Sequence, residues 1–282
     1  MVTIKDLGFS YGENVVLKDI TMTLEEGRIY GLLGGNGVGK TTLLTLLSGL
    51  KKAKAGSIDI DGHNPYDREP SLLTDICYLS DEVAPTNMKA IEYAENYGKF
   101  WERFDLNKFI EIMESFENDI NQKMNRMSFG QLKKTHIAFA LACNTKYLFM
   151  DEPTNGLDIP SKAQFRKAVM KYTREDSTLL ISTHQVRDLE NIIDPIIILD
   201  RQDVLLDASL EKIAEKFFFD YSNDRNEGAL YCEMIPGGNI QVLINTTGED
   251  SKVNIEALFN TVHLHKELVK GLFTMIEDKD EN

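Results

Sequence analysis

The stretch from Gly34 to Thr41 restricts the possible folds more strongly than any other part of this sequence. It reads Gly-Gly-Asn-Gly-Val-Gly-Lys-Thr, follows a short apolar run at 28–33 and precedes leucines at helical spacing in 41–50. A strand, a glycine-rich loop and a helix in this order form a phosphate-binding loop, whose backbone N–H groups and helix dipole attract phosphates. Lys40 adds a positive charge for the outer phosphates, and Thr41 offers a hydroxyl to Mg²⁺. We therefore predict a nucleotide site formed by Gly34, Gly35, Asn36, Gly37, Val38, Gly39, Lys40, Thr41 and Thr42.

A second chemical signal is the run Leu-Phe-Met-Asp-Glu at 148–152, an apolar strand pattern that ends in two carboxylates. In phosphoryl transfer one such acid holds the metal ion, and the other acts on the attacking water. Adjacent acids at a strand end can also form a solvated turn, but the phosphate loop upstream favours the catalytic interpretation. We therefore expect Asp151 to bind Mg²⁺ together with Thr41, and Glu152 and Lys40 to be catalytic.

Short apolar runs alternate with helical patterns along most of the chain. The runs that predict strands are 28–33, 57–61, 76–79, 147–150 and 178–182, and the patterns that predict helices are 41–50, 132–142 and 161–172. Such alternation is typical of a mostly parallel sheet with helices on both of its faces. The pattern therefore predicts an α/β fold.

Three further regions have patterns of their own. Runs at 2–7 and 15–24, separated by a Gly-Glu-Asn turn signal, predict an antiparallel β region at the start. From about 87 to 125 the pattern is helical, and we interpret its aromatic residues as core packing. These residues are Tyr93, Tyr97, Phe100, Trp101 and Phe104. Beyond about 209 we expect an appended α+β unit that ends in a frayed acidic tail at 278–282.

Composition excludes several classes of protein. Hydrophobic residues make up 42% and charged residues 27%, as in an ordinary globular protein, and the net charge of −14 disfavours nucleic acid as a partner. Residues 203–282 hold 7 basic and 16 acidic side chains, a net charge of −9, which we interpret as a solvated face. The three cysteines are widely separated, which predicts neither a disulfide framework nor a zinc site and favours a reducing cytoplasm. No run approaches the roughly 20 apolar residues of a membrane span, so we expect any membrane role to come through a partner.

Four further motifs resemble those of ABC-type ATPases. Residues 127–131, Met-Ser-Phe-Gly-Gln, resemble the signature sequence of that family and precede the Asp-Glu pair at the interval typical of it. Residues 151–158 resemble its metal-binding strand with the following D-loop, and Ser-Thr-His at 182–184 resembles its switch-histidine motif. Tyr11 stands where the family stacks an aromatic ring on adenine. The resemblance covers roughly residues 1–208.

The resemblance implies a P-loop NTPase fold, with a mostly parallel sheet flanked by helices, an N-terminal antiparallel β subdomain and a small C-terminal α+β appendage. Residues 1–208 would form the ABC ATP-binding domain, with a helical subdomain at about 87–130. Residues 209–282 would form an accessory domain, for which three roles stay open: a dimerisation module, a regulatory sensor or added bulk.

The resemblance also implies an ATPase that uses ATP and Mg²⁺ and dimerises head to tail. Ser128, Gly130 and Gln131 would then contact the ATP held by the partner, and His184 would be a catalytic contact to the terminal phosphate. The expected partners are a second copy or a paralogous ATPase subunit and integral membrane permease subunits, but no nucleic acid. The chain would lie in the cytoplasm, peripheral on the inner face of the cell membrane, where it powers export of peptides, antibiotics or lipids through a separate permease.

Three positions depart from the family pattern. Phe129 replaces the usual glycine after the signature serine and would crowd a close backbone approach. Asp81 stands where a metal-contacting glutamine is common, and its carboxylate can still approach Mg²⁺. Gly35 stands where proline is frequent, a change that should leave the hydrogen bonds of the loop intact. We predict slower or partner-dependent hydrolysis. The alternatives are a soluble ABC ATPase, for example of the iron–sulfur assembly type, and an ATP-gated switch with little turnover.

Overall fold

The structure is a computed structural model that describes residues 1–274. The acidic tail expected at 278–282 lies outside the described residues. Among the described residues, no helix combines the length and the apolar character needed to cross a bilayer.

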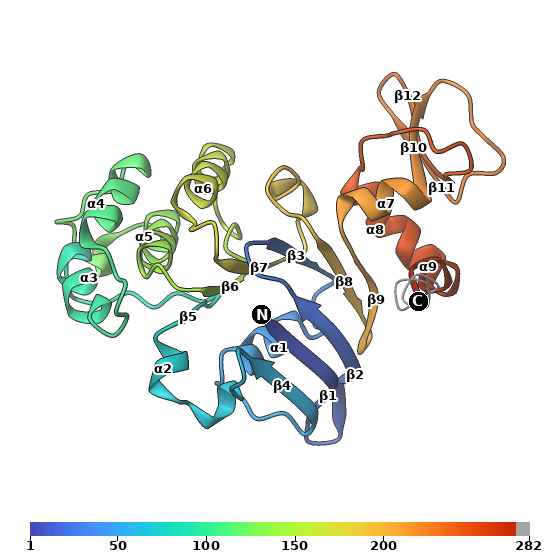
Figure 1. Cartoon of the computed structure of the whole chain (residues 1–282). Coiled ribbons are helices and arrows are strands. Elements are labelled where there is room, and N and C mark those ends of the chain that lie inside the picture. Colours follow the sequence, from blue (N-terminus) through green and yellow to red (C-terminus); the bar gives the residue numbers. More distant parts are fainter. Residues whose placement is uncertain (275–282) are drawn as a thin grey trace.

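A six-stranded sheet forms the centre of the molecule (Figure 1). Its order is β5 (Ile76–Leu79), β6 (Tyr147–Asp151), β7 (Thr178–Thr183), β3 (Ile29–Leu33), β8 (Ile196–Asp200) and β9 (Asp203–Ala208). The first five strands are parallel, and β9 pairs antiparallel with β8. The strands predicted within the parallel part are confirmed to within a residue or two, because each is a short apolar run that both faces of the sheet bury.

The pleat of each central strand divides its side chains between two hydrophobic clusters. On β6, Leu148 and Met150 point into one cluster, whereas Tyr147 and Phe149 point into the other. Successive side chains of a strand face opposite sides, so one run of apolar residues serves both cores. A fully apolar strand is therefore required here.

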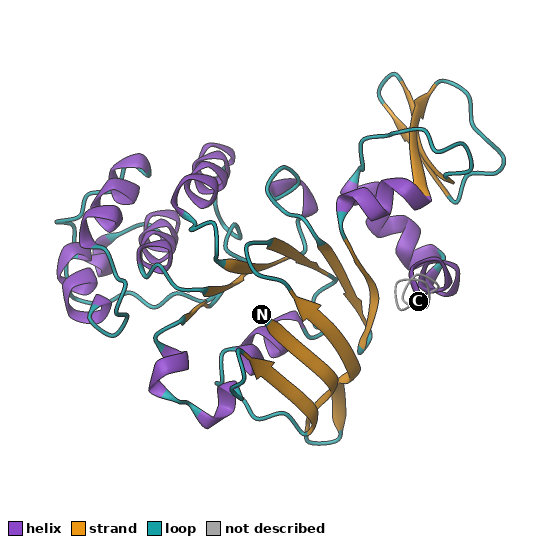
Figure 2. Cartoon of the chain, in the orientation of Figure 1, coloured by secondary structure: helices purple, strands orange, loops and turns teal. Residues whose placement is uncertain are grey.

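The antiparallel region expected at the start is confirmed. It forms a separate three-stranded sheet in the order β2 (Asn14–Leu24), β1 (Val2–Tyr11) and β4 (Ala55–Ile60). Leucines of helix α1 (Lys40–Leu47) belong to the cluster that this sheet shares with the central sheet. Helix α1 thus lies between the two sheets, as Figure 2 shows.

The other face of the central sheet is covered by helices. They are α5 (Phe129–Ala142) and α6 (Ile159–Tyr172), with α3 (Ala90–Gly98) and α4 (Leu106–Ser115) beside them. The single helical stretch predicted at 87–125 is thus two α-helices. Short turns of helix are α2 (Pro70–Leu73), η1 (Pro65–Asp67), η2 (Met124–Arg126) and η3 (Val186–Asp188).

The aromatic residues of the 87–125 region divide into two groups. The rings of Tyr93, Trp101 and Phe104 pack around Phe139 of α5, with centroids 5.1–5.6 Å away, so the core interpretation is right for them. It is wrong for Phe100, whose side chain is 65% exposed at the end of α3. Tyr97 is exposed too, because the helical stripe is wider than the face that α5 covers.

The C-terminal part is an α+β unit, as expected. It consists of α7 (Leu210–Lys216), β10 (Phe217–Ser222), β11 (Tyr231–Ile235), β12 (Gly238–Ile244), α8 (Ile255–Leu264) and α9 (Lys266–Thr274). Its strands form an antiparallel sheet in the order β10-β12-β11. Its buried residues continue the hydrophobic cluster of the α5 and α6 face. The unit is therefore packed against the rest of the chain, at the right in Figure 1.

Candidate active site

The predicted phosphate loop connects β3 to α1. Gly37 and Gly39 have φ angles of 78° and 113°, a left-handed region that favours glycine. A Cβ atom on Gly39 would also lie 2.8 Å from a methyl group of Leu17. Gly39 is the N-cap of α1 and offers no side-chain cap, so N–H groups of the first turn stay available to a ligand. The exposed tip of the loop, Gly35 to Gly37, is open to solvent.

Lys40 lies buried across this loop. Its Nζ donates to the carbonyl oxygens of Gly34 and Gly35 at 2.8 and 3.1 Å, and it lies 3.2 Å from Oε1 of Glu152. A buried ammonium is stable only when its charge is compensated in this way. Because phosphate oxygens carry the same charge as Glu152, a nucleotide in the loop would compete with this carboxylate for Lys40.

Asp151 is buried at the carboxyl end of β6, where three segments meet. Its Oδ2 accepts a hydrogen bond from Thr41 Oγ1 at 2.6 Å, and its Oδ1 accepts from Ser182 Oγ at 2.6 Å. Within residues 1–274, no group of three or more His, Cys, Asp or Glu side chains could hold a metal ion by itself. Mg²⁺ prefers few protein ligands, which are oxygens, with waters and phosphates as the others. The hydroxyl of Thr41 and the buried carboxylate of Asp151 fit such an ion.

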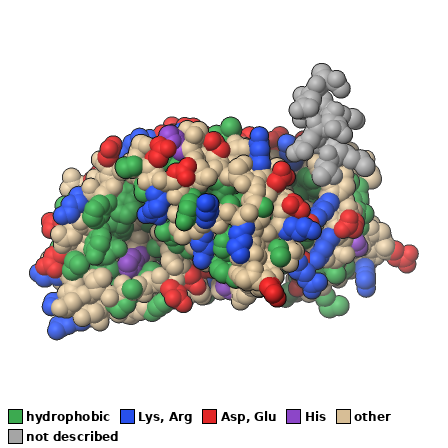
Figure 3. Space-filling view, turned by 90° about the horizontal axis from the view of Figure 1, so that it is seen from below, with side chains coloured by type: hydrophobic (Ala, Val, Ile, Leu, Met, Phe, Trp, Pro, Cys, Tyr) green, Lys and Arg blue, Asp and Glu red, His purple; other side chains and the backbone are tan. Residues whose placement is uncertain are grey.

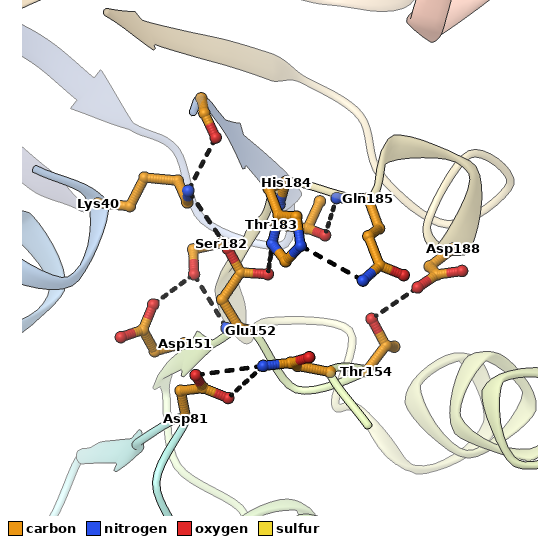
Figure 4. A network of polar contacts seen from close by, with 12 residues as sticks. Lys40, Asp81, Asp151, Glu152, Thr154, Ser182, Thr183, His184, Gln185 and Asp188 are labelled. Atoms are coloured by element: carbon orange, nitrogen blue, oxygen red, sulfur yellow. Dashed lines mark hydrogen bonds and ion pairs between the residues drawn. The ribbon is translucent and has the colours of Figure 1, made fainter. Parts of the chain in front are cut away.

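Glu152 is held in an unusual conformation. Its φ angle is 45°, in the left-handed region that ordinary residues rarely adopt. Its N–H donates to Ser182 Oγ at 3.0 Å, and its Oε2 lies 2.9 Å from Nδ1 of His184. Figure 4 shows Lys40 and His184 on either side of this carboxylate. The structure thus brings four of the predicted residues together: Lys40, Asp151, Glu152 and His184.

The signature residues have local contacts instead. Ser128 Oγ accepts from the N–H of Gln131 at 3.2 Å, and Gln131 Oε1 accepts from the N–H of Ser128 at 2.9 Å. This reciprocal capping box begins helix α5, and Gly130 lies in its first turn.

Tyr11 stands beside the phosphate loop with its ring half exposed. Its hydroxyl lies 3.3 Å from Oγ1 of Thr42, and Nζ of Lys51 lies 4.9 Å from its ring centroid. Phe9 contacts it edge to face at 5.0 Å. A ring supported in this way presents a flat apolar surface near the loop.

Asp81 has partners that sequence reasoning missed. Its Oδ1 lies 3.1 Å from Nζ of Lys133, and its two carboxylate oxygens lie 3.3 and 3.4 Å from Nδ2 of Asn155. Burial lowers the pKa of Lys133, while the hydrogen bond to Asp81 raises it. A lysine on the apolar side of a predicted helix, next to Leu132, was the signal that could have pointed to this pair. Asp81 as a metal ligand stays a prediction.

A second missed network ties the segment after His184 to the loop after Glu152. Asp188 Oδ2 accepts from Thr154 Oγ1 at 3.1 Å and lies 2.7 Å from Nζ of Lys162. Lys162 also donates to Gln185 Oε1 at 2.8 Å. Figure 4 shows Asp188 and Thr154 joined in this way. The loops that carry the histidine and the carboxylate are thus connected by direct hydrogen bonds.

Comparisons with known proteins agree with this geometry. A family model described as ABC transporter matches residues 17–155. The chain is 28% identical to the ABC transporter ATP-binding protein NatA of Bacillus subtilis, over 83% of this chain and 97% of that protein. It is 31% identical to a probable ABC transporter ATP-binding protein of Azorhizobium caulinodans, over 73% of this chain and 76% of that protein.

Among solved structures, the chain is similar to a dimeric ATP-binding cassette in a post-hydrolysis state with ADP and phosphate. The TM-score is 0.65 and the identity 25%, over 74% of this chain and 99% of that one. Fold, site geometry and relatives therefore lead to one conclusion: this chain belongs to the family of ABC transporter ATP-binding proteins, and it carries the ATPase domain of that family.

Proposed function

We propose that this chain is the ATP-hydrolysing subunit of an ABC transporter and works as a head-to-tail dimer on a separate membrane permease. The observation that carries the proposal is the meeting of Lys40, Asp151, Glu152 and His184 at one edge of the central sheet. Residues 1–208 would be the ATP-binding domain and residues 209–282 an accessory domain.

In this proposal each residue of the edge has a role in hydrolysis. The loop residues 34–42 hold the phosphates, and Thr41 and Asp151 hold Mg²⁺, which neutralises phosphate charge when bound. ATP takes Lys40 from Glu152, and the freed carboxylate orients the attacking water. His184, now 2.9 Å from Glu152, then contacts the terminal phosphate.

Dimerisation is supported by the position of the signature segment, whose side chains make no hydrogen bond to the phosphate loop among the described residues. The side-chain hydrogen bonds of Ser128 and Gln131 are instead local to the start of α5. A helix N-terminus is a good site for an anion, so this one suits the phosphate of an ATP on a second subunit. The similar solved cassette is a dimer.

A permease contact is supported by an apolar hollow beside the helical region. The hollow has a volume of about 530 Å³. Its lining includes Leu50, Leu73, Ile76, Phe100 and Trp101. Figure 3 shows hydrophobic side chains at the left of the lower face, on the side where Figure 1 places α2 and α3. Exposed apolar surface of this kind marks an interaction site, and Phe100, which lines the hollow, is 65% exposed.

Export is the proposed direction of transport. Among similar proteins is the lantibiotic transport ATP-binding protein SrtF of Streptococcus pyogenes, 29% identical over 69% of this chain and 84% of that protein. A petrobactin import ATP-binding protein of Bacillus subtilis is 27% identical over 76% of this chain and 89% of that protein. Uptake or release of cargo by vesicles that contain the permease would therefore decide the direction.

The test of the mechanism compares wild type with Glu152→Gln. The neutral amide keeps the shape of the side chain but orients water poorly, so phosphate release should fall by about 10²- to 10³-fold. Size-exclusion chromatography in ATP and Mg²⁺ should then show a stable dimer. The matched control is Glu111→Gln, which changes an exposed carboxylate that pairs with Lys171.

Two outcomes would change the assignment. If Glu152→Gln hydrolyses ATP as fast as wild type, the catalytic role of this carboxylate is wrong. If wild type dimerises with ATP and releases no phosphate, the chain is an ATP-gated switch.

A further inference from the structure

Two side chains that depart from the family pattern contact the same short segment. Asp81 accepts hydrogen bonds from Asn155. The ring of Phe129 lies against Gly156, where an added Cβ atom would come within 2.4 Å of Cε1 of that ring. Asn155 and Gly156 follow Glu152 by only three and four residues. Both departures therefore act on the loop directly behind the catalytic carboxylate.

Lys133 connects this loop to helix α5. Its side chain is 0% exposed, and its Nζ donates to the backbone oxygen of Asp81 at 2.6 Å as well as to the carboxylate at 3.1 Å. A buried ammonium is stable only with its charge compensated, so Lys133 resists separation from Asp81. Helix α5 and the segment after β5 are thereby held in one relative position.

The connection continues to Glu152 through Asn155. The amide of Asn155 contacts both carboxylate oxygens of Asp81, and its backbone N–H donates to the carbonyl oxygen of Glu152 at 3.1 Å. Lys133, Asp81, Asn155 and Glu152 thus form an unbroken series of polar contacts. Lys133 lies two residues after Gln131, on the helix that begins with the signature segment.

The conformation of Glu152 explains why this support is needed. A left-handed φ of 45° at a residue other than glycine is strained and persists only where the surroundings enforce it. Ser182 holds the N–H of Glu152 from one side. Asp81 and Phe129 hold the following loop from the other side, through Asn155 and Gly156.

We propose that Lys133 is a positioning residue for ATP hydrolysis. Through Asp81 and Asn155 it fixes the loop that orients Glu152, and it links that carboxylate to the helix whose start carries the signature segment. Lys133 touches no nucleotide in this role and acts on turnover, not on ATP affinity. The inference rests on the proposed catalytic role of Glu152.

The first test is Lys133→Met, which keeps the length of the side chain and removes its charge. A small displacement of a catalytic group lowers the rate strongly, so kcat should fall about 10- to 100-fold while KM for ATP changes less than about three-fold. The control is Lys171→Met, which removes an exposed lysine paired with Glu111 and should leave kcat unchanged. Melting curves with and without ATP show whether each variant folds and binds nucleotide.

A second variant tests the same series of contacts without touching the buried charge. Asn155→Ala removes only the last link, so kcat should again fall with KM preserved even if Lys133→Met does not fold. Because both variants break one series, the double variant should be no slower than the slower single one. If the losses of kcat in the two single variants add up in the double variant, Lys133 and Asn155 act independently, which contradicts a single series of contacts.

A kcat within two-fold of wild type in a folded Lys133→Met overturns the proposal, and so does the same result in Asn155→Ala. A parallel loss of ATP affinity would also overturn it, because it indicates a general structural defect. Glu152→Gln is measured beside them. If it loses turnover while the other two variants do not, only the role of Lys133 is wrong, and if it keeps turnover, the catalytic assignment itself fails.

Discussion

The carboxyl edge of the central sheet and the C-terminal unit use charged side chains in opposite ways. At the edge, Lys40, Asp151 and Glu152 are buried, and each has several partners from different segments. In the C-terminal unit the ion pair of Glu256 with Arg187 joins two exposed side chains. Buried polar groups must be fully paired and are therefore fixed in space, whereas surface pairs contribute little. Chemistry is therefore expected at the edge, and the surface pair is expected to add little to stability.

The C-terminal unit contacts the rest of the chain through apolar side chains as well as through this ion pair. The C-terminal unit shares its hydrophobic cluster with the α5 and α6 face, through residues such as Ile255, Leu258 and Val262 of α8. Helix α8 also carries Glu256, which pairs with Arg187 of η3, three residues after His184. The unit therefore shares an apolar core with the α5 and α6 face and lies next to the segment that follows His184.

The largest expected effect is the loss of ATP turnover on replacing Lys40, compared with no loss on replacing Lys212. Lys40→Ala removes the ammonium that the phosphate loop surrounds, so ATP turnover should fall by about 10²- to 10³-fold. Lys212→Ala changes an exposed lysine of α7 in the C-terminal unit and should leave turnover unchanged. Phosphate release measures both. Turnover above a tenth of wild type in Lys40→Ala would contradict the role of this lysine.

The next comparison uses two methionines. Met150 on β6 is 0% exposed, and Met234 on β11 is 85% exposed. Met150→Ala should lower the free energy of unfolding by about 2–5 kcal/mol, because it leaves a cavity in the core. Met234→Ala should change it by no more than about 0.5 kcal/mol. Urea unfolding measures both values, and equal losses would show that the contrast in packing is wrong.

His136, a half-buried histidine of α5, should make the free energy of unfolding depend on pH. Burial lowers the pKa of His136 to about 4, from 6.5, and its ring contacts Tyr93 edge to face. Between these values the unfolded chain binds a proton that the folded chain does not, so stability falls as the pH decreases from 6.5 towards 4. The loss between pH 7.5 and pH 5 should be about 2 kcal/mol.

The variant His136→Phe should remove that part of the pH dependence while keeping an aromatic ring against Tyr93. Urea unfolding of wild type and variant at pH 7.5 and pH 5 measures the difference. The same loss of stability in both proteins would show that another group is responsible.

The smallest expected change in stability is at the exposed ion pair of Arg187 with Glu256. Arg187→Gln should lower the free energy of unfolding only slightly, because an exposed ion pair is screened by water and salt. The effect should shrink further in 1 M salt. Comparison with Glu256→Gln and with the double variant in urea unfolding isolates the pair. A larger coupling energy would mean that charge, not apolar packing, attaches the C-terminal unit.

Local patterns in the sequence were sufficient for much of the fold and of the site. The spacing of Gly34, Gly39 and Lys40 predicts the phosphate loop, because the backbone conformation that binds phosphates needs glycine at set positions. The apolar run that ends in Asp151 and Glu152 predicts a strand with two acids at its end. In each case the residues that determine the structure are neighbours in the chain.

The contacts of Lys133 and Phe129 could not be predicted in this way. Lys133 meets Asp81 across 52 residues of sequence, and Asp81 meets Asn155 across 74. Residue types and their local spacing are enough to tell which chemical groups the ATPase has and which strand, loop or helix carries each of them. Which of these groups support one another depends on the packed fold, because burial and pairing energies depend on distances that arise when separate strands and helices pack.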